Sequence, residues 1–170
     1  MIRRTFLGVL SSLVGMCAMP GRWIRAAEPD TFVPLREIVT LPAESVPGAW
    51  TTADFNAFLK DPGEPDIDKM LKGILIRTDR DLQAYCIYCP HEVCMVTFRE
   101  DTSTLKLEQP REETHPLMVC PCHFSAFDPL QDGAKISGPA WRGLYRFRVE
   151  QDRDVIHITG VERNVLTLYN

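Results

Sequence analysis

Short segments of alternating apolar and polar residues fill most of the chain after residue 32. Alternation with a period of two is typical of β-strands that bury one face. The clearest case is residues 144–150, and residues 154–159 are expected to return as its hairpin partner. The side chains of the first strand that are expected to point inward are Tyr145, Phe147 and Val149. Further strands are predicted at residues 73–77, 82–88 and 165–169.

Three segments interrupt this pattern. Residues 52–59 are predicted to form one short helix with Asp54 near its start. Residues 61–66, rich in proline and charge, are predicted to form a surface loop. Residues 100–115 are rich in charge and contain Pro110, which predicts a long connection. We expect this connection to be a solvated excursion; a docking surface is the alternative, because long ordered loops are often functional.

The N-terminal segment has the pattern of a targeting sequence. Two arginines at residues 3–4 are followed by Phe-Leu and then by an uncharged apolar stretch over residues 6–19. This pattern resembles a twin-arginine export signal. The stretch is shorter than the roughly twenty residues that span a bilayer. Residues 1–24 are therefore predicted to be a removed signal or a membrane anchor formed by residues 5–24, and residues 25–31 a linker or hinge.

Composition narrows the class of protein. A chain of 170 residues with 45% hydrophobic residues suits one domain with a short appendage. The net charge of −4 gives no sign of a nucleic-acid partner. Of the six cysteines, Cys17 lies in the N-terminal segment and the other five lie between residues 86 and 122. Such clustering indicates a site and not disulfides distributed along the chain.

Two cysteine–histidine motifs carry the candidate chemistry. Residues 89–94 read Cys-Pro-His-Glu-Val-Cys, and residues 120–125 read Cys-Pro-Cys-His-Phe-Ser. Together they offer four cysteines and two histidines. A structural zinc site is the conservative alternative, but zinc knuckles commonly have C-x2-4-C and H-x3-5-H spacing, which neither motif shows. Cys86 and Cys89 are formally C-x-x-C, although Ile and Tyr between them are typical of a strand.

A [2Fe–2S] cluster with two thiolates on one iron and two imidazoles on the other needs one cysteine and one histidine from each motif. The spacing supplies these from Cys89, His91, Cys120 and His123. The pattern resembles the Rieske iron–sulfur proteins, specifically those with a disulfide beside the cluster. This resemblance implies one [2Fe–2S] cluster bound by those four residues. It also implies that the remaining two cysteines of the motifs form a disulfide, Cys94–Cys122.

The resemblance also implies an all-β fold. The expected Rieske domain covers residues 32–170, with an antiparallel β base built from residues 32–85 and 132–170. A smaller cluster-binding lobe is expected at about residues 86–131, and an N-terminal apolar helix is expected before the domain.

Residues near the second motif are expected to adjust the reduction potential. Ser125 stands where the serine of the family donates a hydrogen bond to a bridging sulfide and raises the potential. Phe127 stands where relatives of high potential have a tyrosine that bonds a ligand thiolate. Phenylalanine cannot donate, so an intermediate or lower potential is expected. Phe124 replaces the glycine that is common after the histidine.

A third segment resembles the proline loop that covers the cluster in the family. Its residues are Gly138, Pro139 and Ala140. Trp141 replaces the usual second proline, so the loop is expected to shield the cluster with less rigidity there.

These features suggest two functions. The leading hypothesis is the Rieske subunit of a quinol-oxidising cytochrome bc-type respiratory complex at the periplasmic face of the cytoplasmic membrane. Its partners would be cytochrome b-type and c-type subunits and a quinol, with His91 and His123 as exposed ligands that couple electron and proton transfer. The alternative is the small electron-transfer subunit of a periplasmic arsenite-oxidase-type molybdenum oxidoreductase, with a molybdopterin catalytic subunit. Residues 123–128 resemble that group more closely.

No independent catalytic site is expected. Rieske oxygenases add a mononuclear iron held by two histidines and a carboxylate. Only His115 and His157 remain for such a role, and they are expected to be a loop residue and a strand residue.

Overall fold

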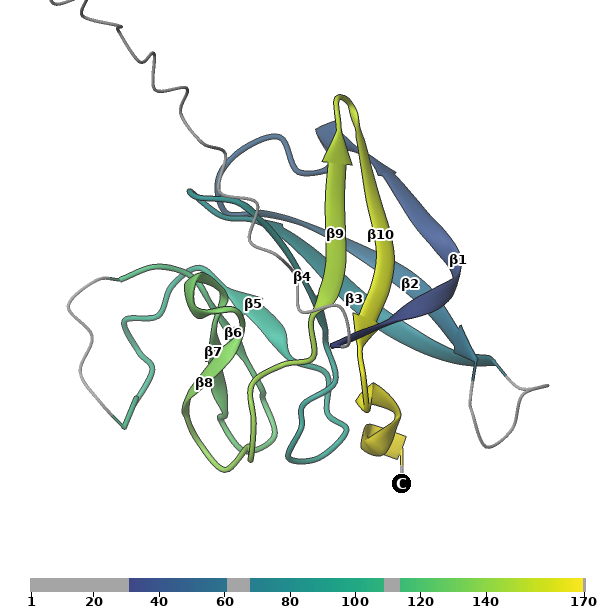
Figure 1. Cartoon of the computed structure of the whole chain (residues 1–170). Helices are drawn as coiled ribbons and strands as arrows, with labels where there is room; N and C mark the ends of the chain where they lie inside the picture. Colours follow the sequence, from purple (N-terminus) through teal and green to yellow (C-terminus); the bar gives the residue numbers. More distant parts are fainter. Residues whose placement is uncertain (1–30, 61–67, 109–113, 170) are drawn as a thin grey trace, which may run out of the picture.

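The computed structural model describes residues 31–60, 68–108 and 114–169, and these residues form three antiparallel sheets (Figure 1). One sheet has the order β1-β10-β9 and comprises Phe32–Pro42, Val155–Glu162 and Phe147–Asp152. The second has the order β2-β3-β4 and comprises Thr51–Lys60, Asp68–Arg77 and Leu82–Cys86. The third has the order β5-β6-β7-β8 and comprises Thr97–Arg99, Leu117–Val119, Ala126–Asp128 and Ala134–Ser137.

The first two sheets form a base with one shared core. Phe55 of β2 and Phe147 of β9 meet edge to face, with ring centroids 5.0 Å apart. The chain just before β9 is also bonded to β4, since the amide of Cys86 donates to the carbonyl of Tyr145 at 2.8 Å. Both tyrosine and phenylalanine of the 144–150 segment are buried, and β9 and β10 form the predicted hairpin.

The prediction of a helix at residues 52–59 is wrong. These residues form β2, in which Phe55, Ala57 and Leu59 are buried and the residues between them are exposed. This period of two is the pattern of a strand with one buried face. Phe55 pairs with Gly73 of β3, and its ring occupies the space where a side chain at Gly73 would stand. The pairing with β3 therefore overrides the local signal for a helix start.

The prediction of a last strand at residues 165–169 is also wrong. These residues form a 3-10 helix, η3, Val165–Tyr169. Asn164 has a φ of 70°, in the left-handed region, so the extended backbone of β10 does not continue through it. The amide and the hydroxyl of Thr167 both donate to the carbonyl of Asn164, at 3.0 and 2.7 Å. Val165 and Leu168, three residues apart, are thereby buried against the base core.

The third sheet forms a smaller lobe beside the base (Figure 1). Strand β8 pairs with β7, so this sheet extends to Ser137, beyond the end expected for the lobe at residue 131. Part of the connection at residues 100–115 is folded onto this sheet, because Leu105 and Leu107 pack against its buried residues. The remaining 3-10 helices are η1, Ala43–Ser45, and η2, Pro129–Gln131.

Several predictions lie outside the described residues. They are the signal or anchor at residues 1–24 with its apolar helix, the linker at 25–31 except its last residue, and the loop at 61–66. Residues 109–113 of the long connection also lie outside. Within the part of the chain that the structure describes, none of the helical segments has the length and hydrophobicity of a membrane span.

Candidate metal centre

The two motifs lie on two short loops of the lobe. The first loop follows β4 and is closed by bonds from the amide of Cys89 to the carbonyl of Cys94 (2.9 Å) and from Val96 to Ile87 (2.7 Å). The second loop connects β6 and β7, and the amide of Cys120 donates to the carbonyl of Ser125 at 2.8 Å. The conformation of each loop is therefore stabilised by hydrogen bonds within its own backbone.

The second loop requires an unusual conformation at Phe124. Its φ is 58°, in the left-handed region that residues other than glycine rarely adopt. Its amide donates to the carbonyl of Cys120 at 3.0 Å, and this bond closes the turn. The side chain is 72% exposed. A glycine at this position would relieve this backbone.

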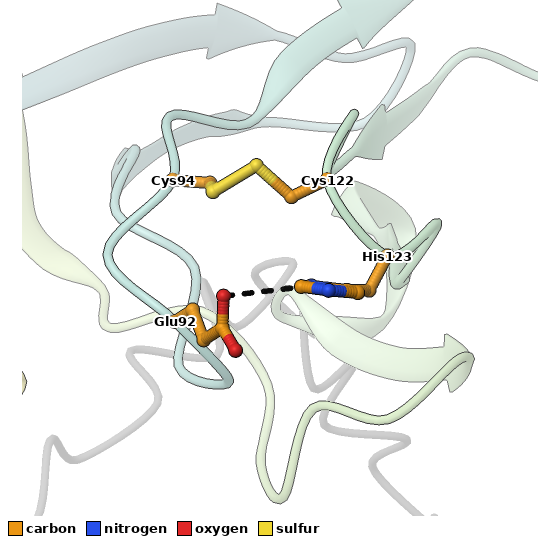
Figure 2. Close-up of a disulfide and its surroundings, with 4 residues drawn as sticks. All are labelled: Glu92, Cys94, Cys122 and His123. Atoms are coloured by element: carbon orange, nitrogen blue, oxygen red, sulfur yellow. Dashed lines mark ion pairs between the residues drawn. A yellow bond between two sulfur atoms is a disulfide. The ribbon is translucent and has the colours of Figure 1, made fainter.

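A disulfide joins the two loops. Cys94 of the first loop and Cys122 of the second are bonded, with their Cα atoms 6.5 Å apart (Figure 2). This confirms the predicted pairing. The sulfur of Cys120 lies within 4.8 Å of both disulfide sulfurs, so the bridge is adjacent to the cysteine that remains free in the second motif.

Cys89 and Cys120 lie together in the interior of the lobe. Both are buried and belong to one packed group of residues. Burial raises the pKa of the Cys89 thiol, backbone amides of His91 and Glu92 that donate to its sulfur lower it, and the neighbouring thiol of Cys120 raises it. Amides aimed at a sulfur favour its thiolate form, which is the form that binds metals.

The two histidines of the motifs also lie together. The rings of His91 and His123 are perpendicular, with centroids 4.8 Å apart. The side chain of His123 remains 46% exposed, and its Nδ1 lies 3.7 Å from a carboxylate oxygen of Glu92 (Figure 2). A nitrogen of each ring and an oxygen of Glu92 all lie within 4.8 Å of one another. The two loops thus bring one buried pair of thiols and one pair of imidazoles into the same region.

The third segment closes one side of the cysteine pair. Ala140 is buried in the packed group that contains Cys89 and Cys120, and its amide donates to the Oγ of Ser125 at 3.0 Å. Gly138 has a φ of 86°, and a Cβ there would stand 2.5 Å from the Cα of Ser125. Only glycine allows the segment to approach the second loop this closely.

The other candidate ligands lie elsewhere. Cys86 belongs to the base core, not to the group around Cys89, and burial raises its pKa to about 12. The formal C-x-x-C pair is therefore divided between two cores. His115 contacts Asp128 at 2.7 Å and stacks on Trp50, while His157 lies in β10. Neither histidine joins the two loops.

Sequence reasoning missed two acidic residues near this region. Glu92 faces His123, although nothing in its spacing within the first motif distinguishes it from a solvated residue. Glu108 accepts a hydrogen bond from the amide of Gly138 at 2.9 Å, and so connects the long excursion to the third segment. In both contacts the two partners are about thirty residues apart in sequence, so no local pattern predicts that they meet.

Fold and geometry together define a small all-β protein with a cysteine–histidine metal centre on paired loops. Residues 57–148, more than half of the chain, match the family model of the Rieske [2Fe-2S] domain. The chain therefore belongs to the Rieske [2Fe–2S] family, and its domain is an electron-transfer domain that holds one [2Fe–2S] cluster. The donor set fits this group, because it provides two adjacent thiols with amides directed at one of them and two adjacent imidazoles.

Several known proteins are similar to this chain. The "Putative respiratory nitrate reductase subunit Rieske" of Haloferax mediterranei is 38% identical over 61 residues, which cover 36% of this chain and 21% of that protein. The chain thus matches about a fifth of the length of this relative.

Two solved structures are similar at low identity. The ferredoxin of carbazole 1,9a-dioxygenase from Nocardioides aromaticivorans IC177 is 16% identical, with a TM-score of 0.46, over 75% of this chain and 96% of that one. The plasma membrane Rieske protein PetC3 from Synechocystis PCC 6803 is 18% identical, with a TM-score of 0.36, over 61% of this chain and 84% of that one.

Proposed function

We propose that Cys89 and Cys120 bind one iron of the cluster and His91 and His123 bind the other. The buried thiol pair and the perpendicular imidazole pair support this assignment. When bound, the cluster accepts and releases one electron at a time. Two neutral imidazoles in place of two thiolates leave the cluster less negative, so its potential is expected within about −150 to +300 mV and above the roughly −400 mV of plant-type clusters.

We further propose that the chain is the Rieske subunit of a quinol-oxidising cytochrome bc-type respiratory complex. The observation that carries this proposal is the Cys94–Cys122 bridge beside the candidate ligands, because the kind of Rieske protein that the motifs resemble has this bridge. His123 remains 46% exposed, so a quinol can reach the ring. The expected partners are cytochrome b-type and c-type subunits.

The twin-arginine pattern supports a position at the periplasmic face of the cytoplasmic membrane, with the N-terminal segment as a signal or as an anchor. That compartment is oxidising, which agrees with a stable disulfide. A cluster inserted before export also requires a route that carries folded proteins.

A second candidate is the small electron-transfer subunit of a periplasmic molybdenum oxidoreductase. Two observations favour it. The segment at residues 123–128 resembles that group, and the relative from Haloferax mediterranei is named as a respiratory nitrate reductase subunit.

Purification of the full chain from membranes of its native host tests these proposals. We expect iron and acid-labile sulfide, and an EPR spectrum of the dithionite-reduced protein with the low average g of nitrogen ligation. Co-purifying b-type haem supports the first candidate, and co-purifying molybdenum supports the second. Zinc without iron contradicts both, together with the ligand assignment.

A pair of variants tests the role of His123. The His123→Ala strain is expected to lose quinol oxidation. The matched control, His157→Ala, changes a histidine in β10 of the base and is expected to retain it. Full activity in the His123→Ala strain contradicts the bc-type assignment.

A further inference from the structure

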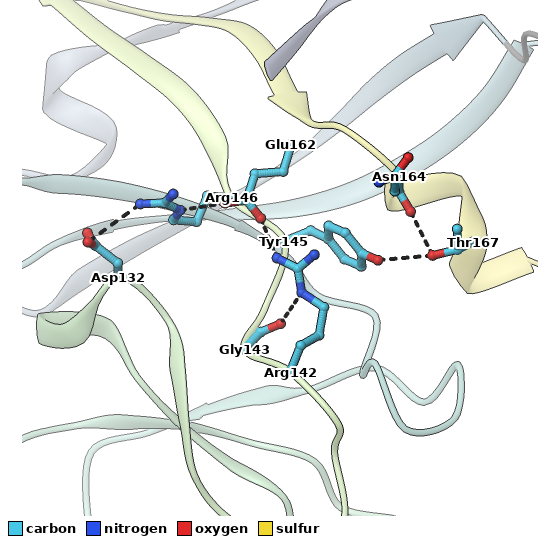
Figure 3. Close-up of polar contacts among 8 residues, drawn as sticks. All are labelled: Asp132, Arg142, Gly143, Tyr145, Arg146, Glu162, Asn164 and Thr167. Atoms are coloured by element: carbon cyan, nitrogen blue, oxygen red, sulfur yellow. Dashed lines mark hydrogen bonds and ion pairs between the residues drawn. The ribbon is translucent and has the colours of Figure 1, made fainter. Parts of the chain in front are cut away.

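A buried carboxylate of the base binds Arg142, which lies two residues after the third segment of the lobe. Glu162, the last residue of β10, is only 7% exposed. Its Oε2 accepts a hydrogen bond from Arg142 at 2.5 Å, and its Oε1 accepts one from Arg146 at 2.8 Å (Figure 3). A buried carboxylate is stable only when it is paired and hydrogen-bonded, so both arginines are needed to satisfy it.

Arg142 is fixed by further contacts with the base. Its guanidinium lies 3.7 Å from the ring centroid of Tyr145, and its Nε donates to the carbonyl of Gly143 at 3.0 Å. Tyr145 is itself buried, and its hydroxyl forms a hydrogen bond of 3.0 Å with Thr167 of the C-terminal 3-10 helix (Figure 3). The side chain of Arg142 therefore packs against Tyr145 of the base core.

The opposite end of the same segment lies against the cysteine pair. Ala140 packs with Cys89 and Cys120, and its amide bonds the buried hydroxyl of Ser125. Trp141 is the one residue between Ala140 and Arg142, and its side chain is 66% exposed. Only one residue therefore separates the contact of Arg142 with the base from the contact of Ala140 with the cysteine pair.

We infer that Glu162 positions residues 138–142 over the cysteine pair by holding Arg142, so that the base controls the access of water to the cluster. The side chain of Trp141 is exposed to solvent, so the order of residues 138–142 depends on the contacts at their two ends. The inference rests on the proposed ligand assignment, and it is independent of which complex the protein serves.

Arg146 provides a matched control because it shares the same carboxylate. It precedes β9, lies opposite Tyr85 in an isolated bridge and is also paired with Asp132 at 3.5 Å. It is not part of residues 138–142. Replacing either arginine by methionine removes one charge and leaves Glu162 with one partner. A purely structural role of Glu162 predicts the same result for both variants.

The test uses the purified, cluster-containing protein and its Arg142→Met and Arg146→Met variants. Hydrogen exchange of the peptide that contains Ala140 is measured by mass spectrometry, together with the rate of iron release to a chelator. We expect Arg142→Met to accelerate both by about tenfold, the effect of losing one charge-assisted hydrogen bond. We expect Arg146→Met to change both by less than about twofold, because its residue lies outside the segment.

Equal acceleration in the two variants, or no acceleration in Arg142→Met, overturns the inference. Should Arg142→Met fail to fold, Arg142→Lys is used instead, because it keeps the positive charge but lacks the planar guanidinium group. It is expected to accelerate hydrogen exchange and iron release by a smaller factor. The wild-type protein is first assayed for iron and nitrogen ligation. Wild-type protein without iron contradicts the proposed function. If the wild type contains iron but Arg142→Met leaves the hydrogen exchange of the Ala140 peptide unchanged, this inference alone is contradicted.

Discussion

Phe127 packs in the interior of the lobe with the two cysteines that we propose as ligands. It is fully buried in the packed group that contains Cys89 and Cys120. A phenyl ring excludes water there but offers no proton to a sulfur. The location of Phe127 is therefore compatible with the expected intermediate or lower reduction potential, because the residue lies in the same buried group as Cys89 and Cys120.

A Phe127→Tyr variant is expected to have a higher potential than the wild type. A hydroxyl that donates to a ligand thiolate stabilises the reduced cluster, and one net hydrogen bond corresponds to about 20–60 mV for one electron. Redox titration followed by EPR measures the change. Phe58→Tyr, on the exposed face of β2, is the control and is expected to leave the potential unchanged. A potential for Phe127→Tyr at or below that of the wild type contradicts the argument.

The contacts of some single residues could be predicted from the sequence, and those of others could not. The disulfide partners were predicted from the resemblance that the two motifs carry, and the pairing is confirmed. Glu162 could not be found this way. Its role depends on two arginines that approach it only after β9 and β10 have paired, and no spacing in the sequence encodes that approach.

At the scale of elements, the third segment depends on the glycine at its start. Gly138→Ala is expected to destabilise the protein by about 2 kcal/mol or more, because the left-handed backbone costs 1–2 kcal/mol and the new Cβ meets the backbone of Ser125. Chemical denaturation measures the loss, and faster iron release is expected with it. Gly48→Ala is the control, since nothing lies within 4 Å of its Cβ position. Equal stability of the two variants contradicts this explanation.

The bridge between the two loops is the second element-scale feature. Cys94 and Cys122 are separated by 28 residues, so a Cys94→Ala/Cys122→Ala double variant is expected to lose about 3–4 kcal/mol of unfolding free energy. The loss is expected to be larger in iron-free protein, because the bound cluster cross-links the same two loops. Urea denaturation with and without iron measures both values. A double variant as stable as the wild type in the iron-free form contradicts the expectation.

Strands were predicted correctly where apolar and polar residues alternate regularly. The predictions failed where contacts with distant parts of the chain determine the secondary structure. The hairpin of β9 and β10 follows from its alternating residues. Residues 52–59 have a polar residue near their start and read locally as a helix, but the ten-residue β2 pairs along its whole length with β3. Residues 165–169 are apolar and β-prone, yet the left-handed Asn164 ends the strand before them. Neither the pairing of β2 with β3 nor the left-handed backbone at Asn164 can be recognised in a short window of sequence.

For the whole molecule, the separation of base and lobe decides how the protein responds to loss of its metal. The base core includes residues of both three-stranded sheets, and neither Cys89 nor Cys120 belongs to it. Removal of iron by a chelator under reducing conditions is therefore expected to expose amides of the lobe and leave the base protected. Hydrogen exchange of the iron-free protein measures this. Simultaneous loss of protection in both parts would show one cooperative unit instead.

The all-β class and the existence of a lobe could be predicted from the two motifs and the resemblance they carry. The way in which the lobe is attached could not. Glu108 of the long excursion and Arg142, two residues after the third segment, reach partners that are about 20 to 30 residues away in sequence. Such contacts depend on the assembled topology.

The covalent link between the two loops also changes the kinetics of metal retention. A side chain that detaches from iron cannot diffuse away, because the loop that carries it is tied to the loop that still holds the metal. Its effective concentration near the vacant coordination position stays high, so recapture competes favourably with escape. A protein built in this way would keep its iron through transient ligand dissociation, even where no machinery for reinsertion is at hand.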